Sequence, residues 1–134
     1  MRLLLFFALA FVLAPAALAQ PALPTGDWSG TIEWADAAPV ALTGGLEACV
    51  EGLKLTLHSE DGAYQAEEVV RIEDATEAPA FGFGMRNTRR NYALTCDAAR
   101  QPDGTFAGTC RADNGARAVL RLQPPAQATI GCSE

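Results

Sequence analysis

Apolar and polar residues alternate with a period of two along most of this chain, and no other feature of the sequence constrains its fold as tightly. Between Trp28 and Trp34, the even positions are apolar or small and the odd positions are polar. Similar alternation recurs in later segments, at residues 53–58, 64–72, 92–98, 106–112 and 118–122. Because successive side chains of a β-strand point to opposite faces, each segment is expected to form a strand with one buried face. The sequence therefore predicts an all-β, antiparallel domain.

Turn signals between these segments indicate how neighbouring strands pair. Asp61-Gly62 suits the centre of a two-residue hairpin turn. Pro102-Asp103-Gly104 suits a type I turn followed by a glycine bulge, and this turn sets Cys96 opposite Cys110. Asp113-Asn114-Gly115 is interpreted as a three-residue turn, because a two-residue turn would shift the register by one and put arginines on the inner face.

The uninterrupted series of hairpins predicts a small antiparallel meander of six to eight strands. Since an open sheet leaves unpaired edges, a closed or nearly closed β-barrel is favoured over a two-sheet sandwich. The strand signal is weak in residues 35–52, where only residues 40–42 are a strand candidate, and in residues 75–91. The tail from about residue 124 contains two prolines and is expected to be irregular.

The N-terminus has the pattern of a cleaved secretory signal. Arg2 precedes an apolar run from Leu3 to Ala14 that is too short to span a bilayer, and Ala17-Leu18-Ala19 supplies the small residues of a cleavage site. We expect residues 1–19 to be removed, with an uncleaved membrane anchor as the competing interpretation. Residues 20–134 then form a single β-barrel domain. The Arg-, Ala- and Gly-rich composition is typical of a bacterial protein, so a periplasmic or secreted location is expected.

The charge of the mature chain limits its partners. Arg2 is the one charged residue of the leader, so the mature chain carries 9 basic and 16 acidic residues, a formal charge of −7. This balance argues against nucleic acid and against anionic membrane surfaces. A soluble monomer without a membrane span is expected after cleavage.

The four cysteines all lie in the mature part, and an even number in a short exported chain predicts two disulfides. The hairpin register places Cys96 opposite Cys110, which leaves Cys49 and Cys132 to each other. The rival pairing joins Cys49 to Cys96 and Cys110 to Cys132. Zinc is not expected, because no C-x-x-C pair is present and the chain has one histidine.

Gly26-Asp27-Trp28, at the start of the first strand, resembles the G-x-W start of the calycin group, which includes lipocalins, avidins and small bacterial relatives. Residues 103–109 also look like a barrel hairpin of these proteins. The resemblance implies a barrel over residues 26–123 in which Trp28 closes one end under a basic side chain of the last strand, a part for which Arg121 is placed. The long first loop of lipocalins and the biotin-contact pattern of avidins are missing, so biotin binding is not implied.

No enzyme site, metal site or cofactor is predicted. His58 is the sole histidine, is expected at an outward position, and has no G-x-S-x-G motif to accompany it. Glu67 and Glu68 are consecutive, so they point to opposite faces of a strand instead of converging as a glycosidase pair. Glu68 is the polar exception at an inward position. No calcium-binding loop motif is present.

Aromatic and basic residues are the candidates for binding. If the barrel mouth is open, we expect it to hold a small-molecule site that is lined by Trp34, Phe83 and Tyr92. The competing interpretation is that the aromatic residues simply fill the barrel. Three arginines reverse the local charge and are expected to be mostly exposed, where they could grip an anionic ligand or an acidic partner: Arg86, Arg89 and Arg90.

Two function classes therefore remain. The first is an exported, non-enzymatic barrel that binds a small apolar or amphipathic ligand. The second is a periplasmic protein-interaction or inhibitor module, lysozyme-inhibitor-like in general form, that uses the Arg86–Arg90 loop. An open cavity would favour the first class, and a filled barrel with a protruding loop would favour the second.

Overall fold

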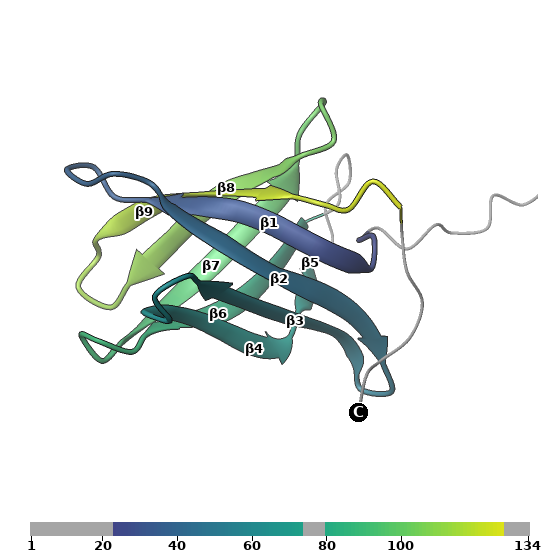
Figure 1. Ribbon diagram of the computed structural model, residues 1–134, viewed down its shortest axis with the longest axis horizontal. Helices are drawn as coiled ribbons and strands as arrows, with labels where there is room; N and C mark the ends of the chain where they lie inside the picture. The colour runs from purple at the N-terminus through teal and green to yellow at the C-terminus, as the bar shows by residue number, and fades with distance from the viewer. Residues whose placement is uncertain (1–22, 74–79, 128–134) are drawn as a thin grey trace, which may run out of the picture.

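The part of the chain that the structure describes forms nine β-strands, and no helix in it is long and apolar enough to cross a membrane (Figure 1). The structure is a computed structural model that describes residues 23–73 and 80–127. The predicted signal peptide, residues 1–19, lies outside them. The strands in chain order are β1 (Gly26–Glu33), β2 (Val40–Cys49), β3 (Gly52–Ser59), β4 (Tyr64–Val69), β5 (Arg71–Glu73), β6 (Ala80–Asn87), β7 (Tyr92–Arg100), β8 (Phe106–Ala112) and β9 (Arg117–Gln123).

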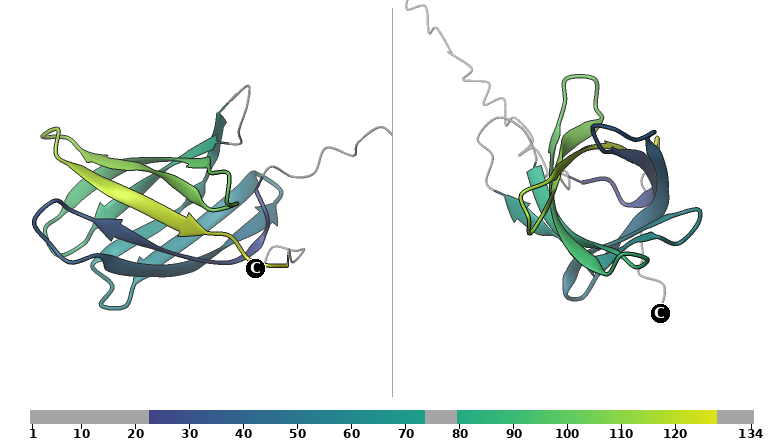
Figure 2. Two further views of the ribbon diagram at one scale, coloured as in Figure 1. Left: turned by 90° about the horizontal axis from the view of Figure 1, so that it is seen from above. Right: turned by 90° about the vertical axis from the view of Figure 1, so that its left-hand side faces the viewer.

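The strands close into an antiparallel barrel, which confirms the predicted fold class. Their order in the sheet is β4-β3-β2-β1-β9-β8-β7-β6-β5, and β4 also pairs with β6. The eight strands from β4 to β6 in this order, these two closing partners included, form the ring that Figure 2 shows end-on. The short β5 is an additional strand that pairs with β6. Closure pairs the first strand with the last, so the meander leaves little free sheet edge.

The second and third turns have the predicted geometry. The Gly104 amide donates to the Gln101 carbonyl at 2.9 Å, and Gly104 has a φ of 87°. This arrangement is expected for a type I turn with a glycine bulge. Cys96 consequently pairs with Cys110, and Cys110 pairs with Ala118 across the third turn. Both predicted registers are confirmed.

The first turn differs from the prediction in its centre but not in its register. Leu57 pairs with Ala66, so the apolar positions match. However, the closing hydrogen bond runs from the Gly62 amide to the Ser59 carbonyl at 3.0 Å, which moves the centre one residue earlier. The Asp61 side chain accounts for the shift, because its Oδ1 accepts a hydrogen bond from Ser59 Oγ at 2.7 Å. Such a side-chain bond offers the backbone an alternative turn.

Two strands form where the sequence pattern is weak. β2 has ten residues, although only residues 40–42 were a strand candidate, and β6 runs through the Phe81–Gly84 stretch. Glycines weaken the strand signal of both segments in the sequence, because glycine is normally a turn signal. At Gly44 a Cβ atom would lie 1.7 Å from the Thr56 carbonyl oxygen, so the close approach of β3 requires glycine there. Such glycines let a strongly curved sheet close.

Inward side chains fill the barrel. Trp28 is buried and its ring centroid lies 5.2 Å from that of Phe106 and 6.0 Å from that of Phe81. The indole N–H of Trp28 donates to the Pro24 carbonyl at 2.8 Å, so this buried donor is satisfied. Other large side chains that are fully buried include Leu23, Ile32, Leu42, Leu46, Leu55, Leu57, Phe83, Met85 and Leu120.

Arg121 does not cover Trp28, so this expectation from the calycin resemblance is wrong. In β9, Leu120 and Leu122 are buried and Arg121 between them is exposed. Because alternate residues of a strand face opposite sides, Arg121 lies on the outer face while Trp28 lies on the inner one. The rings of Phe81 and Phe106 pack against this tryptophan.

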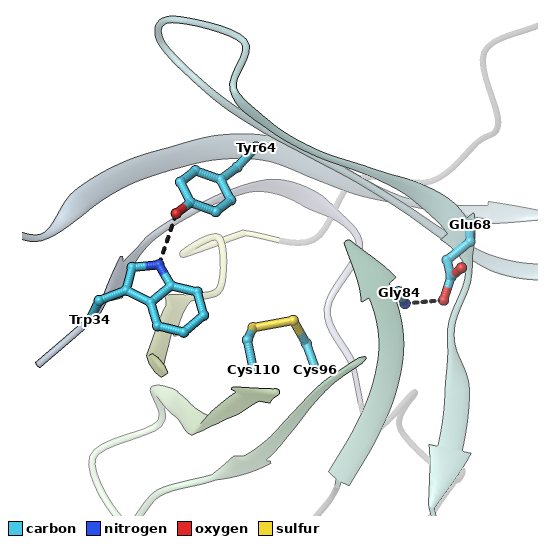
Figure 3. The surroundings of a disulfide bond; sticks show 6 residues. All are labelled: Trp34, Tyr64, Glu68, Gly84, Cys96 and Cys110. Atoms are coloured by element: carbon cyan, nitrogen blue, oxygen red, sulfur yellow. Dashed lines mark hydrogen bonds between the residues drawn. A yellow bond between two sulfur atoms is a disulfide. The ribbon is translucent and has the colours of Figure 1, made fainter. Parts of the chain in front are cut away.

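The seam between β4 and β6 is only partly closed by backbone hydrogen bonds. The two strands pair at two positions, the first of which joins Tyr64 to Asn87. Further along, the Glu68 carboxylate accepts a hydrogen bond from the Gly84 amide (Figure 3). The side chain of Glu68 therefore spans a gap in the ladder, which explains why an acidic residue occupies an inward position.

Ile72 lies at an inward position of the alternating pattern but is not buried. It pairs with Phe81, and 55% of its surface is exposed. The reason is that β5 is an edge strand, which pairs with β6 alone among the described strands and lies outside the ring that encloses the core.

The Cys96–Cys110 disulfide joins β7 to β8 inside the barrel and confirms the predicted pairing (Figure 3). The two Cα atoms are 4.0 Å apart and both residues are fully buried. Cys49, at the end of β2, is also disulfide-bonded. Cys132 lies outside the described residues, so the Cys49–Cys132 pairing stays a prediction.

Candidate functional site

A pocket of about 730 Å³ occupies one end of the barrel. Hairpin turns gather at the two ends (Figure 2), and the pocket lies among those that follow β1, β3, β6 and β8. These turns share one end because each antiparallel strand reverses the direction of the one before it. The pocket walls combine aromatic, amide and basic side chains, chiefly Trp34, Tyr64, Asn87, Arg89, Arg90 and Tyr92.

Trp34 and Tyr64 point toward each other across this mouth (Figure 3). Trp34 directly follows β1 and is partly buried, whereas Tyr64 begins β4 and is 7% exposed. The Trp34 indole N–H donates to the Tyr64 hydroxyl at 2.8 Å. The pair thus presents apolar rings to the pocket while its buried polar atoms satisfy each other.

Tyr92 adds a second hydroxyl beside this pair. It begins β7 and accepts a hydrogen bond from Asn87 Nδ2 at 3.2 Å. Burial, followed by the neighbouring Tyr64 hydroxyl, raises the pKa of Tyr92 above its ordinary value of 10.0. The side chains of Asn87 and Arg90 partly oppose this rise. Tyr92 is therefore a neutral hydroxyl at physiological pH.

Asn87 organises the turn between β6 and β7. Its Oδ1 accepts hydrogen bonds from the backbone amides of Arg89 at 3.1 Å and Arg90 at 3.0 Å. The same turn is tied to the neighbouring β3–β4 turn, because the Thr88 amide donates to the Ala63 carbonyl at 2.7 Å. The position of the basic residues at the rim is thus fixed by bonds on two sides.

The three arginines are all exposed, as predicted, but they do not form one loop. Arg86 belongs to β6, lies outside the pocket lining, and donates to Asn91 Oδ1 at 2.8 Å. Arg89 and Arg90 lie in the turn and line the pocket. Arg89 forms an ion pair with Asp61 at 3.3 Å. Hydrogen bonds from the Ala63 amide and the Ser59 hydroxyl lower the pKa of Asp61 and keep it ionised.

The structure brings together two of the three residues predicted to line a ligand site. Trp34 and Tyr92 both line the pocket. Phe83 is fully buried within the barrel, where its ring stacks on Phe81 with a centroid distance of 5.8 Å. Phe83 lies near the middle of β6, whereas the mouth is formed by strand ends, so it belongs to the packed interior.

Two lining residues, Tyr64 and Asn87, were not among the sequence candidates. Tyr64 carries a signal that was available, because it is the aromatic residue directly after a turn, at an inward position. An asparagine at the end of an apolar stretch commonly accepts backbone hydrogen bonds in a following turn. The sequence could suggest that role, but the contact of Asn87 with Tyr92 depends on how the strands pair.

Basic, acidic and phenolic side chains lie in the pocket wall. The ionisable residues in the pocket wall are Arg89, Arg90, Tyr92 and Asp113, with Tyr64 beside Tyr92. His58 lies elsewhere, exposed on the outer face, with its Nε2 3.5 Å from Thr43 Oγ1. Within residues 23–73 and 80–127, no group of three or more His, Cys, Asp or Glu side chains could hold a metal ion.

Comparison with known proteins adds no relative: no family model, no curated protein and no solved structure matches this chain.

Proposed function

We propose that this protein is an exported, non-enzymatic β-barrel that holds a small apolar or amphipathic molecule in its mouth pocket. The observation that carries the proposal is the pocket itself, which has a volume of about 730 Å³ and aromatic walls. Small-molecule sites in proteins commonly measure roughly 300–1,000 Å³ and are mostly apolar with a few polar groups. The pocket matches both properties.

The polar atoms of the wall also favour this proposal. Trp34 forms a hydrogen bond with Tyr64, and Asn87 forms one with Tyr92, so these polar groups are satisfied without a bound ligand. An apolar molecule could therefore enter without leaving them unpaired, which would otherwise cost about 1–3 kcal/mol for each group. The proposal of export is supported by the leader-like residues 1–19 and by the buried Cys96–Cys110 disulfide, since disulfides persist in oxidising compartments.

The test uses a neutral apolar probe, phenylnaphthylamine, and the two tryptophans of the chain. Trp34 lines the pocket, whereas Trp28 lies six residues earlier along β1, roughly 20 Å away at about 3.3 Å per residue. Titration should be saturable and should shift the indole N–H resonance of Trp34 but not that of Trp28. The Trp34→Phe variant assigns the resonance. A probe that fails to saturate, or shifts both resonances equally, would refute the proposal.

A second function is favoured by one observation, the exposure of Arg86, Arg89 and Arg90 around a single turn. This basic surface suits an acidic protein partner, so the chain could act as a periplasmic interaction or inhibitor module. Inhibition of a lysozyme by the purified protein, abolished in an Arg86→Ala variant that keeps its affinity for the neutral probe, would favour this function. Arg86 separates the two functions because it is outside the pocket.

A further inference from the structure

The three arginines near the β6–β7 turn differ in the partners of their guanidinium groups. Arg86 bonds to Asn91, and Arg89 is paired with Asp61. The guanidinium of Arg90 has no hydrogen bond or ion pair with any residue in the described part of the chain. Arg90 therefore places an unneutralised positive charge at the pocket, in a mature chain whose formal charge is −7.

The backbone that carries this charge is held in place. The Arg90 amide donates to Asn87 Oδ1 at 3.0 Å, and Thr88 in the same turn bonds to Ala63 of the next turn. Binding to a group on a fixed turn requires less ordering of the chain, so more of the interaction energy appears as affinity.

An aromatic surface lies beside the charge. Tyr92 follows Arg90 by two residues, and Trp34 lines the same pocket. Burial raises the pKa of Tyr92, and the charge of Arg90 partly opposes that rise, which indicates that the guanidinium lies near the phenol. The pocket thus offers one cation next to apolar ring surface.

We propose that the mouth pocket takes a small amphipathic anion, whose charged group pairs with Arg90 and whose apolar body packs against Trp34 and Tyr92. This inference rests on the proposed function and adds the class of ligand. A guanidinium binds carboxylate, sulfonate and phosphate groups alike, so the shared chemistry is the anion and not one headgroup. Asp113 also lines the pocket, from the β8–β9 turn, and its charge disfavours an anion placed on that side.

The test compares two probes that differ by one charge: phenylnaphthylamine and anilinonaphthalene sulfonate. At low ionic strength, Arg90→Gln should weaken binding of the sulfonate by about fivefold, the upper range for an exposed ion pair, and leave the neutral probe unchanged. Raising the salt to ~0.15 M should shrink the preference of the native protein for the sulfonate, because the Debye length falls to about 8 Å.

Two variants serve as matched controls. Arg86→Gln removes the same charge from an exposed residue near the same turn but outside the pocket, so both probes should bind as they do to the native protein. Asp113→Asn removes the negative charge from the wall and should strengthen binding of the sulfonate about twofold while leaving the neutral probe unchanged.

Competition separates an amphipathic anion from a simple one. Decanoate should displace the sulfonate probe, and inorganic phosphate should not. Displacement by phosphate as effectively as by decanoate would overturn the inference, and so would equal losses in Arg86→Gln and Arg90→Gln. In either case saturable binding of the neutral probe would leave the proposed function standing. If the neutral probe does not bind at all, the proposed function fails and the ligand class fails with it.

Discussion

At the scale of single residues, the mouth of the barrel depends on side chains that satisfy one another. Trp34 donates to Tyr64, and Asn87 both donates to Tyr92 and accepts from the backbone of the following turn. A neutral Tyr92 hydroxyl suits this arrangement, because ionisation would put a negative charge in a partly buried place next to a second phenol. The acid–base behaviour of Tyr92 is therefore a direct readout of the site.

We predict that Tyr92 titrates above the ordinary tyrosine pKa of 10.0, chiefly because burial disfavours the phenolate. The chain has two tyrosines, so the ultraviolet absorbance of a Tyr64→Phe variant reports Tyr92 alone. In that variant the pKa should fall toward 10.0 but remain above it, since burial persists while the hydroxyl neighbour is lost.

The sign of the linked stability change follows from the direction of this shift. A raised pKa in the folded state means that the stabilising effect is complete below pH 10 and is lost as the pH rises through the folded pKa. The free energy of unfolding should therefore fall above pH 10 in the native protein, and by less in a Tyr92→Phe variant. A Tyr92 that titrates at or below 10.0 would contradict the burial seen in the structure.

At the scale of elements, the β4–β6 seam is where closure of the barrel relies on a side chain. The two strands share a short ladder, and Glu68 continues it by accepting the Gly84 amide. A Cβ on Gly84 would lie 3.0 Å from Glu68 Oε2, so the glycine also makes room for this carboxylate. Both residues therefore serve strand pairing at the seam.

We predict that Glu68→Ala lowers the free energy of unfolding by about 1–3 kcal/mol, because it leaves a backbone donor without its acceptor. Glu68→Gln should cost less, since the amide oxygen can still accept. Glu67→Ala is the control: Glu67 is exposed and pairs with Lys54 at 3.1 Å on the outer face, a contact worth at most about 1 kcal/mol. Denaturant unfolding measures these differences.

Amide exchange checks the assignment of the bond itself. The Gly84 amide should be protected in the native protein and should exchange faster in Glu68→Ala but not in Glu67→Ala. If its exchange rate is the same in all three proteins, the seam is held by something other than the Glu68 carboxylate.

At the scale of the whole molecule, the barrel is a ring in which β1 lies beside β9. Ser29 pairs with Gln123, so the start of the first strand is next to the end of the last. The chain could therefore begin at another turn without changing which strands pair. Exposed turn tips tolerate such changes best, and Pro102 and Asp103 lie in an exposed turn at the end of the barrel away from the pocket.

We predict that a circular permutant folds into the same barrel. The permutant links the two ends of residues 20–134 by a flexible segment and opens the chain between Pro102 and Asp103. The opened turn loses the hydrogen bond from Gly104 to Gln101, at a cost of about 1 kcal/mol. The affinity for the neutral probe should not change, because the pocket is at the other end. Loss of the near-ultraviolet circular dichroism would contradict the closed topology.

Much of the fold could be predicted from local sequence, because its causes are local. Alternation selects strands, and a turn such as residues 101–105 sets the register of the hairpin it joins, so the Cys96–Cys110 pairing follows from counting along the chain. The prediction was less complete where glycines interrupt the alternation, as in β2 and β6, since a glycine in a curved strand has the same sequence signal as a glycine in a turn.

The site depended on contacts that no local pattern contains. Trp34, Tyr64 and Tyr92 lie in three different hairpins, and they meet only because β1 pairs with β9 and β4 pairs with β6. Closure also put Phe83 in the packed interior of the barrel, whereas the outward position of Arg121 follows from the alternation along β9 itself. The sequence by itself determined strand identity, hairpin register and one disulfide, since each follows from neighbours along the chain. The tertiary structure alone decided which strand ends share a mouth and which of the three arginines near the β6–β7 turn has no ion pair or side-chain hydrogen bond among the described residues, because closing the ring joins residues far apart in sequence.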